Sequence, residues 1–209
     1  MARDSELSGV GSPGTPNPAV FRNRAMTKNA VVRLCRSAQE TIALGECVGR
    51  LAGPGQVIAL DGPLGAGKTQ LVRGLAIGAG VVNSSMVNSP SYVLLNIYPA
   101  DPVNPAAKTV YHLDAYRTDN PAAFAALGWE ELLEQEGLVV LEWAARVREL
   151  WPADYLHLQA HIIDAHARRW SAVAHGDRSM ALLKALAAAS APPTIPICAR
   201  RVNVQHPTQ

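Results

Sequence analysis

A lysine and a threonine end a glycine-rich stretch, GPLGAGKT, at residues 62–69. The spacing of Gly62, Gly67, Lys68 and Thr69 matches the phosphate-loop pattern G-x-x-x-x-G-K-[ST]. Glycines let the backbone curl so that successive N–H groups point at phosphate oxygens. Lys68 supplies charge to the β- and γ-phosphates, and the Thr69 hydroxyl completes the shell of a Mg²⁺ ion. The pattern therefore predicts a nucleoside triphosphate site, with further contacts from Leu64, Gly65, Ala66 and Gln70.

Proteins with a phosphate loop also need an acidic residue at a strand end for the metal, and the sequence offers two. Asp114 ends the run VYHLD, and Glu142 ends the run LVVLE. Either carboxylate is suited to bind Mg²⁺ directly or through water, or to orient the attacking water. Because Glu142 follows four apolar residues, as in a metal-binding strand, we favour Glu142 together with Thr69 for the metal.

Three further patterns bear on the ligand. No N-K-x-D sequence follows the loop, which favours adenine over guanine. His157 and His161 lie four strand residues apart, roughly 13 Å, which is too far to share one zinc ion. Arg168 and Arg169 lie at a predicted hairpin tip. Their side chains either approach the nucleotide or a partner protein, or are solvated, and the sequence leaves these alternatives open.

The phosphate loop requires a strand before it and a helix after it, and the sequence supplies both. QVIALD, at 56–61, is a short apolar run typical of a buried parallel strand. A helix is predicted from Lys68 to Ala79, with Gly80 as its C-cap. Gly74 and Gly78 weaken this helix by roughly 1 kcal/mol each relative to alanine, so tertiary packing must stabilise it.

The remaining elements complete an α/β pattern. Ser37 and Glu40 have the spacing of a capping box, which starts a helix that ends at Gly53. Strands are predicted at 92–98, 109–114 and 137–142, one or two short helices within 121–135, a hairpin of 155–162 and 169–175, and a last helix at 177–189. This order predicts one α/β domain of the P-loop NTPase class, with a mostly parallel central sheet and flanking antiparallel strands.

Composition limits the class of protein and its compartment. Hydrophobic residues make up 48% of the 209 residues and charged residues 17%, and the net charge of +2 is scattered rather than gathered into a nucleic-acid-binding stripe. The odd set of cysteines (Cys35, Cys47 and Cys198) and the lack of a signal peptide or membrane span predict a cytoplasmic protein. We expect a disordered extension at 1–29, the P-loop domain at 30–189 and a flexible tail at 190–209.

Five segments have the order and spacing of one family. These are GPLGAGKT, NSPSYVLLNIY, YHLDAYR, LGWEELL and VVLEWA, and through them the chain resembles the bacterial TsaE (YjeE) family over about residues 37 to 186. The trio SPSY, HLDAYR and LEW is far more specific than the phosphate loop alone. The resemblance implies an ATPase of tRNA threonylcarbamoyladenosine synthesis that uses ATP and Mg²⁺. It also implies two partners, TsaB and TsaD, the latter transferring a threonylcarbamoyl group to adenosine 37 of certain tRNAs, so that tRNA is met only through the complex.

The resemblance also implies roles for single residues. Lys68 would bind phosphate, Thr69 and Glu142 magnesium, and Asp114 would lie near the γ-phosphate. Ser91 falls in a switch-like loop where the family often has threonine, so the hydroxyl is kept.

Other positions are assigned by the same resemblance. Thr41 and Arg169 are implied neighbours of adenine, and Trp143 stands at an aromatic position whose role is partner contact or core packing. Pro63 departs from the family, which commonly has aspartate there, and removes one N–H at the entrance of the loop.

Three functions are compatible with these motifs. The first is a weak ATPase that drives or resets a tRNA-modifying complex, the second a small-molecule kinase, and the third a nucleotide-dependent interaction module that does not hydrolyse. The region between Gly128 and Trp151 offers only Arg146 and Arg148 for a kinase lid, which favours the ATPase. Since the chain shows no evident arginine finger, we expect slow hydrolysis by the protein alone and stimulation by its partners.

Overall fold

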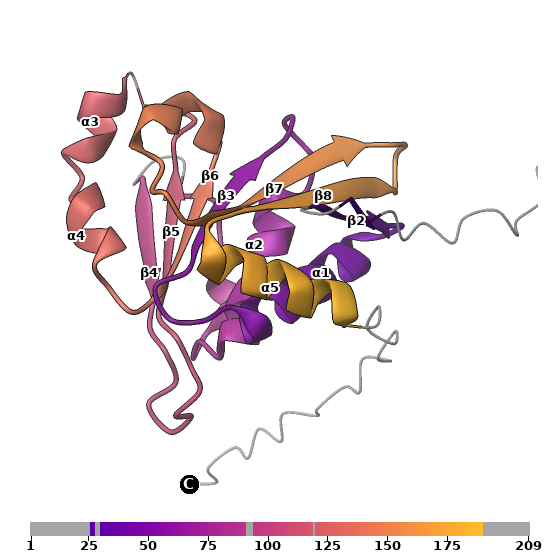
Figure 1. Ribbon diagram of the computed structural model, residues 1–209, viewed down its shortest axis with the longest axis horizontal. Coiled ribbons are helices and arrows are strands. Elements are labelled where there is room, and N and C mark those ends of the chain that lie inside the picture. Colours follow the sequence, from indigo (N-terminus) through magenta and orange to yellow (C-terminus); the bar gives the residue numbers. More distant parts are fainter. Residues whose placement is uncertain (1–25, 28–29, 91–93, 119, 190–209) are drawn as a thin grey trace, which may run out of the picture.

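One twisted sheet runs through the whole domain (Figure 1). The computed structural model describes residues 26–27, 30–90, 94–118 and 120–189. Eight strands are hydrogen-bonded in the order β1-β2-β8-β7-β3-β6-β5-β4. Their bounds are β1 (Met26–Thr27), β2 (Ala30–Cys35), β3 (Val57–Asp61), β4 (Leu95–Tyr98), β5 (Val110–Asp114), β6 (Leu138–Glu142), β7 (Tyr155–Ile162) and β8 (Arg168–His175).

The centre of the sheet is parallel and its flanks are antiparallel. β7, β3, β6 and β5 run in one direction, whereas β8, β2 and β4 each run opposite to a neighbour. The apolar strands β3 and β6 are buried on both faces, as expected for the middle of a parallel sheet. Because parallel strands end at the same edge, Asp61, Asp114 and Glu142 lie along one edge of the sheet.

Helices cover both faces of the sheet (Figure 1). α1 (Ala38–Leu51), α2 (Lys68–Ala79) and α5 (Asp177–Ala188) pack on one face around Trp170. α3 (Pro121–Ala125), α4 (Trp129–Leu133) and the 3-10 segment η3 (Ala144–Leu150) pack on the other face around Phe124. A second 3-10 segment, η2 (Ser84–Met86), follows α2. Burial of apolar side chains in these two layers supplies the main driving force for folding.

Glycines allow α1 and α2 to cross with their backbones in contact. A Cβ atom added to Gly45 of α1 would lie 2.2 Å from the carbonyl oxygen of Leu71, and one added to Gly74 of α2 would lie 2.0 Å from that of Ile42. Both separations are far below van der Waals contact, so larger residues would force the helices apart. Gly74 and Gly78 therefore weaken α2 as a single helix but permit the packing that stabilises it.

The structure confirms most of the predicted elements. The predicted strands at 56–61, 109–114 and 137–142 are β3, β5 and β6, and the predicted hairpin is β7 and β8. The sequence prediction missed β2, because Arg33 interrupts its apolar run and its partner β8 lies far along the chain. The Arg33 guanidinium is satisfied by the carbonyl oxygen of Leu186, to which it donates at 2.7 Å.

Some predicted segments lie partly or wholly outside the residues that the structure describes. Of the predicted strand 92–98, only Leu95–Tyr98 forms β4, while residues 92 and 93 lie outside the described residues. Residues 1–25, 28–29 and 190–209, expected to form the extension and the tail, lie outside them as well. Met26–Thr27 pairs with β2, so strand pairing begins within the predicted extension. In the part of the chain that the structure describes, no helix is both long and apolar enough to cross a membrane.

Candidate nucleotide site

The phosphate loop curls between β3 and α2 on positive φ angles. Gly65 has a φ of 76° and Gly67 a φ of 91°, the left-handed region that glycine adopts without strain. Gly67 is the N-cap of α2 and carries no side chain that would fill the cradle before the helix N-terminus. Of the other predicted loop contacts, Leu64 is exposed at the tip and Ala66 is buried, its N–H donating to the carbonyl oxygen of Pro63 at 3.2 Å.

Lys68 lies back across its own loop. Its Nζ donates to the carbonyl oxygens of Gly62 at 2.8 Å and Pro63 at 3.1 Å, and lies 3.7 Å from the centroid of the Trp143 ring. Trp143 also packs against Tyr116, with ring centroids 4.8 Å apart. The carbonyl of Pro63 thus contributes to the loop although this residue has no N–H. Loop carbonyls and an aromatic face hold the lysine where phosphate oxygens would compete for it.

Two opposing effects act on the Lys68 charge. Burial lowers the pKa of Lys68, and the nearby carboxylates of Glu142, Asp114 and Asp61 counter part of that shift. A buried cation whose pKa is perturbed by desolvation and by specific charged neighbours marks a candidate functional site.

Glu142, at the end of β6, meets the residue that follows Lys68. The Thr69 hydroxyl donates to Glu142 Oε1 at 3.1 Å, and the Nε2 atom of His112 lies 3.0 Å from the same oxygen. Both His112 and Glu142 are almost completely buried. The structure therefore brings the two predicted metal ligands, Thr69 and Glu142, together and adds a histidine to them.

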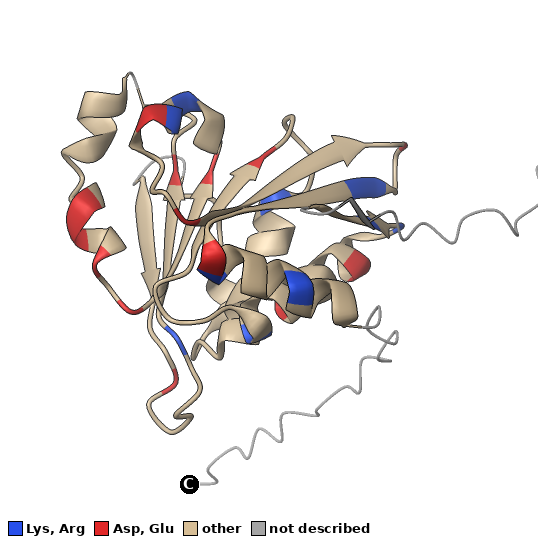
Figure 2. Ribbon diagram, viewed as in Figure 1, with Lys and Arg blue, Asp and Glu red and all other residues tan. Residues whose placement is uncertain are grey.

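Asp114 lies beside Glu142 on the neighbouring strand. The two residues are register partners at the ends of β5 and β6, and Figure 2 shows acidic residues at these adjoining strand ends. The hydroxyl of Ser89 donates to Asp114 Oδ2 at 2.7 Å, and the N–H of Tyr116 donates to Oδ1 at 2.8 Å. Asp114 is thereby linked to the segment that leads to Ser91, and Ser91 itself lies outside the described residues.

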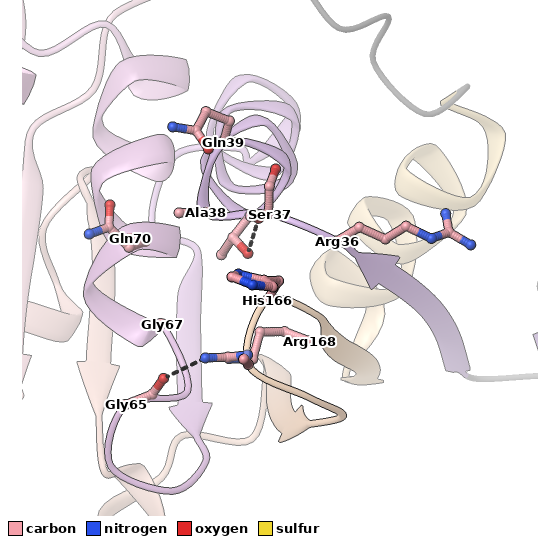
Figure 3. Close-up of a pocket in the computed structure, with 11 residues that line it drawn as sticks. Arg36, Ser37, Ala38, Gln39, Gly65, Gly67, Gln70, His166 and Arg168 are labelled. Carbon is pink, nitrogen blue, oxygen red and sulfur yellow. Dashed lines mark hydrogen bonds between the residues drawn. The ribbon is translucent and has the colours of Figure 1, made fainter.

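A cleft of about 410 Å³ opens beside the loop. We use "the cleft" for this cavity, which three segments line: the start of α1 (Arg36, Ser37, Ala38, Gln39, Thr41), the loop and α2 (Gly65, Gly67, Gln70), and the β7–β8 hairpin (Ala165, His166, Arg168). Figure 3 shows Arg168 reaching from the hairpin to the loop, where it donates to the carbonyl oxygen of Gly65 at 3.2 Å. Figure 3 also shows Arg36 extending away from the other lining residues.

One of the two predicted neighbours of adenine lines the cleft. Thr41 lines the cleft, as does Gln70, but Arg169 does not; the arginine that does is Arg168. Successive residues of a strand face opposite sides of the sheet, so Arg169 is turned away from the cleft and is exposed. The cleft therefore favours Arg168 over Arg169 as the arginine beside a bound nucleotide.

Sequence reasoning missed two residues that the structure places at the site. His112 is two residues before Asp114, so the period-2 alternation of β5 was a signal that both face Glu142. Asp61 ends β3 directly before the loop; its Oδ1 accepts the N–H of Ala145 at 3.0 Å, and its Oδ2 lies 3.0 Å from His157 Nε2. Asp61 therefore ties the start of the loop to η3 and β7.

The donor set fits a magnesium ion held jointly with phosphate. Among the described residues, no three His, Cys, Asp or Glu side chains lie close enough to hold a metal ion by themselves. Mg²⁺ normally takes one or two protein oxygens and fills its shell with water and phosphate oxygens, and the Thr69 hydroxyl and Glu142 carboxylate are hard oxygen donors of that kind. Cys35 and Cys47 are buried and free, and Cys198 lies outside the described residues.

Sequence comparison identifies the family. Residues 35–170 match the family described as "Threonylcarbamoyl adenosine biosynthesis protein TsaE". The chain belongs to the TsaE family. The TsaE protein of Treponema pallidum (strain Nichols) is 39% identical over 117 residues, covering 56% of this chain and 81% of that protein. The TsaE protein of Mycobacterium leprae (strain TN) is 31% identical over 153 residues, covering 69% of this chain and 92% of its own length.

A solved structure supports the same assignment. The crystal structure of Bacillus subtilis YdiB superposes with a TM-score of 0.64 at 26% identity, covering 78% of this chain and 97% of that one. This likeness and the loop between β3 and α2 confirm the predicted P-loop α/β fold. Membership of the TsaE family implies a P-loop nucleotide-binding protein, which agrees with the position of the cleft beside the loop.

Proposed function

We propose that this chain is an ATPase required for the threonylcarbamoyladenosine modification of adenosine 37 in tRNA. The observation that carries the proposal is the hydrogen bond between Thr69 and Glu142 beside the buried Lys68, in a chain of the TsaE family. A lysine, a hydroxyl and a carboxylate gathered at a helix N-terminus are the groups that phosphoryl transfer requires. The TsaE proteins of Treponema pallidum and Bacillus subtilis are named for tRNA threonylcarbamoyladenosine biosynthesis, which supports the same pathway here.

The proposed ligand is ATP with Mg²⁺. Thr69 and Glu142 would hold the metal, which when bound neutralises charge on the β- and γ-phosphates. Lys68 would donate to phosphate oxygens in place of the carbonyl oxygens of Gly62 and Pro63. The backbone N–H groups at the start of α2 would donate to the other phosphate oxygens. The adenine would enter the cleft against Thr41 and Arg168.

Asp114 and Ser91 are the proposed groups on the far side of the γ-phosphate. Asp114 would orient the attacking water, because its carboxylate is held by the Ser89 hydroxyl and the Tyr116 N–H at a strand end next to Glu142. Ser91, two residues beyond Ser89 in the sequence, would contribute a hydroxyl group, as the family resemblance implies. Glu142→Gln should therefore raise the Mg²⁺ requirement, and Asp114→Asn should lower turnover with less change in metal dependence. The reverse result would exchange the two roles.

The hydrolysis is proposed to be slow until partners bind. Arg146 donates to the carbonyl oxygen of Thr118 at 3.2 Å, and the Arg148 guanidinium lies 5.4 Å from the centroid of the Trp151 ring. Neither arginine lines the cleft, which disfavours a kinase lid. We assign the stimulation to TsaB and TsaD in the cytoplasm, with tRNA engaged only through that complex.

Single-turnover hydrolysis of radiolabelled ATP separates the competing functions. The protein alone should turn over on the order of 10⁻⁴ to 10⁻³ s⁻¹, and TsaB with TsaD should increase this rate. Transfer of label to a small acceptor without partners would favour a kinase, and tight binding with no hydrolysis under any condition would favour an interaction module. Loss of threonylcarbamoyladenosine from the tRNA of depleted cells, restored by the wild-type gene but not by Lys68→Ala, would place the activity in the pathway.

A further inference from the structure

We infer that His112 is a positioning residue that sets which oxygen of Glu142 faces the metal. This inference rests on the proposed function, because it assigns a role to a residue beside the proposed metal ligand. It starts from a buried histidine that the proposed ATP and Mg²⁺ contacts do not use. His112 lies in the middle of β5, with none of its surface exposed.

His112 and Thr69 bond to the same oxygen atom. The Thr69 hydroxyl donates to Glu142 Oε1 at 3.1 Å, and His112 Nε2 lies 3.0 Å from that oxygen. A carboxylate oxygen accepts through two lone pairs, so these two bonds fill Oε1. No hydrogen bond from the residues that the structure describes reaches Oε2, which leaves that oxygen to bind a metal ion or its water.

The surroundings of the ring select its tautomer. Glu142 only accepts as a carboxylate, so His112 must carry its proton on Nε2 to bond with it. The other ring nitrogen, Nδ1, is buried and has no partner among the described residues. A proton on Nδ1 would be a buried donor without an acceptor, so the Nε2–H tautomer fits the site better than the Nδ1–H tautomer.

Position in the sheet explains why the histidine is suited to this role. His112 and Asp114 project to the same face of β5, toward α2, while Glu142 projects to that face from the adjacent β6. The rigid sheet fixes the ring, and the ring fixes the carboxylate about its last torsion, which is otherwise soft. Partners of this kind around metal ligands typically affect metal affinity or activity by about 10- to 100-fold.

Removing and restoring the N–H donor tests the inference. His112→Phe keeps a ring but removes the donor, His112→Gln places an amide N–H near the position of Nε2, and His112→Asn carries an amide too short to reach Glu142. The measurement is Mn²⁺ affinity of the complex with a non-hydrolysable ATP analogue, read from the electron paramagnetic resonance of free Mn²⁺. Affinity for the analogue without metal is measured in parallel, and His161→Phe serves as a control on β7.

The inference predicts that His112→Phe and His112→Asn weaken Mn²⁺ binding by about 10- to 100-fold while affinity for the metal-free analogue stays unchanged. His112→Gln and His161→Phe should bind Mn²⁺ like the wild type. Wild-type Mn²⁺ affinity in both His112→Phe and His112→Asn would overturn the inference about His112 but would leave the proposed metal site intact. A loss of metal-free analogue affinity equal to the Mn²⁺ loss would also overturn it, because it would indicate a general structural role. If the wild-type complex itself bound no Mn²⁺, the proposed metal site, and not only the role of His112, would be wrong.

Discussion

The parallel centre of the sheet and its antiparallel flank contribute to the candidate nucleotide site in different ways. In the centre, β3, β6 and β5 end side by side, and their ends carry the phosphate loop, Glu142 and Asp114. In the flank, the β7–β8 hairpin contributes its tip, with Arg168 crossing to Gly65 through one hydrogen bond of 3.2 Å. The centre places charged groups on buried strand ends, whereas the flank closes the cleft through a half-buried side chain.

This difference indicates where chemistry and where affinity are expected to reside. Groups at the strand ends of the centre are held by several bonds each, as Glu142 is by Thr69 and His112. Arg168 is a long side chain on a hairpin, so ordering it costs conformational entropy that offsets part of its contact energy. Substitutions in the centre should therefore have larger effects than substitutions in the flank.

Replacement of the loop lysine should give the largest effect. Lys68→Ala removes the charge-assisted contacts to phosphate, each worth about 1.5 to 3 kcal/mol, so ATP affinity should fall by at least tenfold. Isothermal titration calorimetry with ATP and Mg²⁺ measures this loss. The exposed Lys184→Ala variant is the control, and unchanged affinity in Lys68→Ala would remove the phosphate-loop assignment.

The helix crossing behind the loop should be the next most sensitive region. Gly74→Ala places a Cβ atom 2.0 Å from the carbonyl oxygen of Ile42, and such overpacking costs about 1 to 3 kcal/mol of unfolding free energy. Gly53→Ala is the matched control, because an added Cβ there meets no atom within 4 Å. Urea denaturation of both variants should show a loss only for Gly74→Ala; equal midpoints would contradict the close crossing.

In the flank, Arg168 and Arg169 form a matched pair for testing the register. Arg168→Ala removes the hydrogen bond to the phosphate loop and part of one wall of the cleft, so nucleotide affinity should fall by about 0.5 to 1.5 kcal/mol. Arg169→Ala should leave affinity unchanged because its side chain is not part of the cleft. Binding of a fluorescent ATP analogue compares the two variants, and a larger effect of Arg169→Ala would favour Arg169 as the neighbour of adenine.

The smallest effect should be a pH-dependent change in stability at Asp154, which precedes β7. Asp154 accepts the N–H groups of Arg178 and Ser179 at the start of α5 and the Ser179 hydroxyl. Burial raises the pKa of Asp154, but these hydrogen bonds and the Arg178 charge outweigh it, and the net pKa lies below its ordinary value. A carboxylate with a lowered folded-state pKa stabilises the protein above its unfolded-state pKa, and the contribution is lost as pH falls through the folded-state pKa.

Asp154→Ala should therefore destabilise the protein by about 1 kcal/mol at neutral pH, as for loss of a helix cap. The difference from wild type should disappear at acidic pH, where the wild-type carboxylate is protonated as well. Urea denaturation at a series of pH values tests this, with the exposed Glu134→Ala as control. A difference that persists at low pH would assign the effect to packing rather than to the charge.

The same two regions show how far sequence alone carries the prediction. The loop, β3, α2, Glu142 and Asp114 were predicted because local patterns define them: a glycine-lysine motif, short apolar runs and acids at strand ends. β2 was missed and Arg169 was chosen over Arg168 because antiparallel register depends on pairing between distant segments. His112 was missed for another reason. A histidine inside an apolar strand is most simply interpreted as a core residue, and only its contact with Glu142 in the structure links it to the site.

The contact between α1 and α2 has a consequence for how a ligand enters and leaves. The start of α1 lines one side of the cleft and the start of α2 carries the loop, and the two helices touch backbone to backbone through Gly45 and Gly74. Two of the three walls are therefore held together by direct backbone packing. The hairpin is the remaining wall, joined to the loop by the Arg168 side chain. Opening of the cleft would therefore require displacement of the hairpin rather than separation of the two helices.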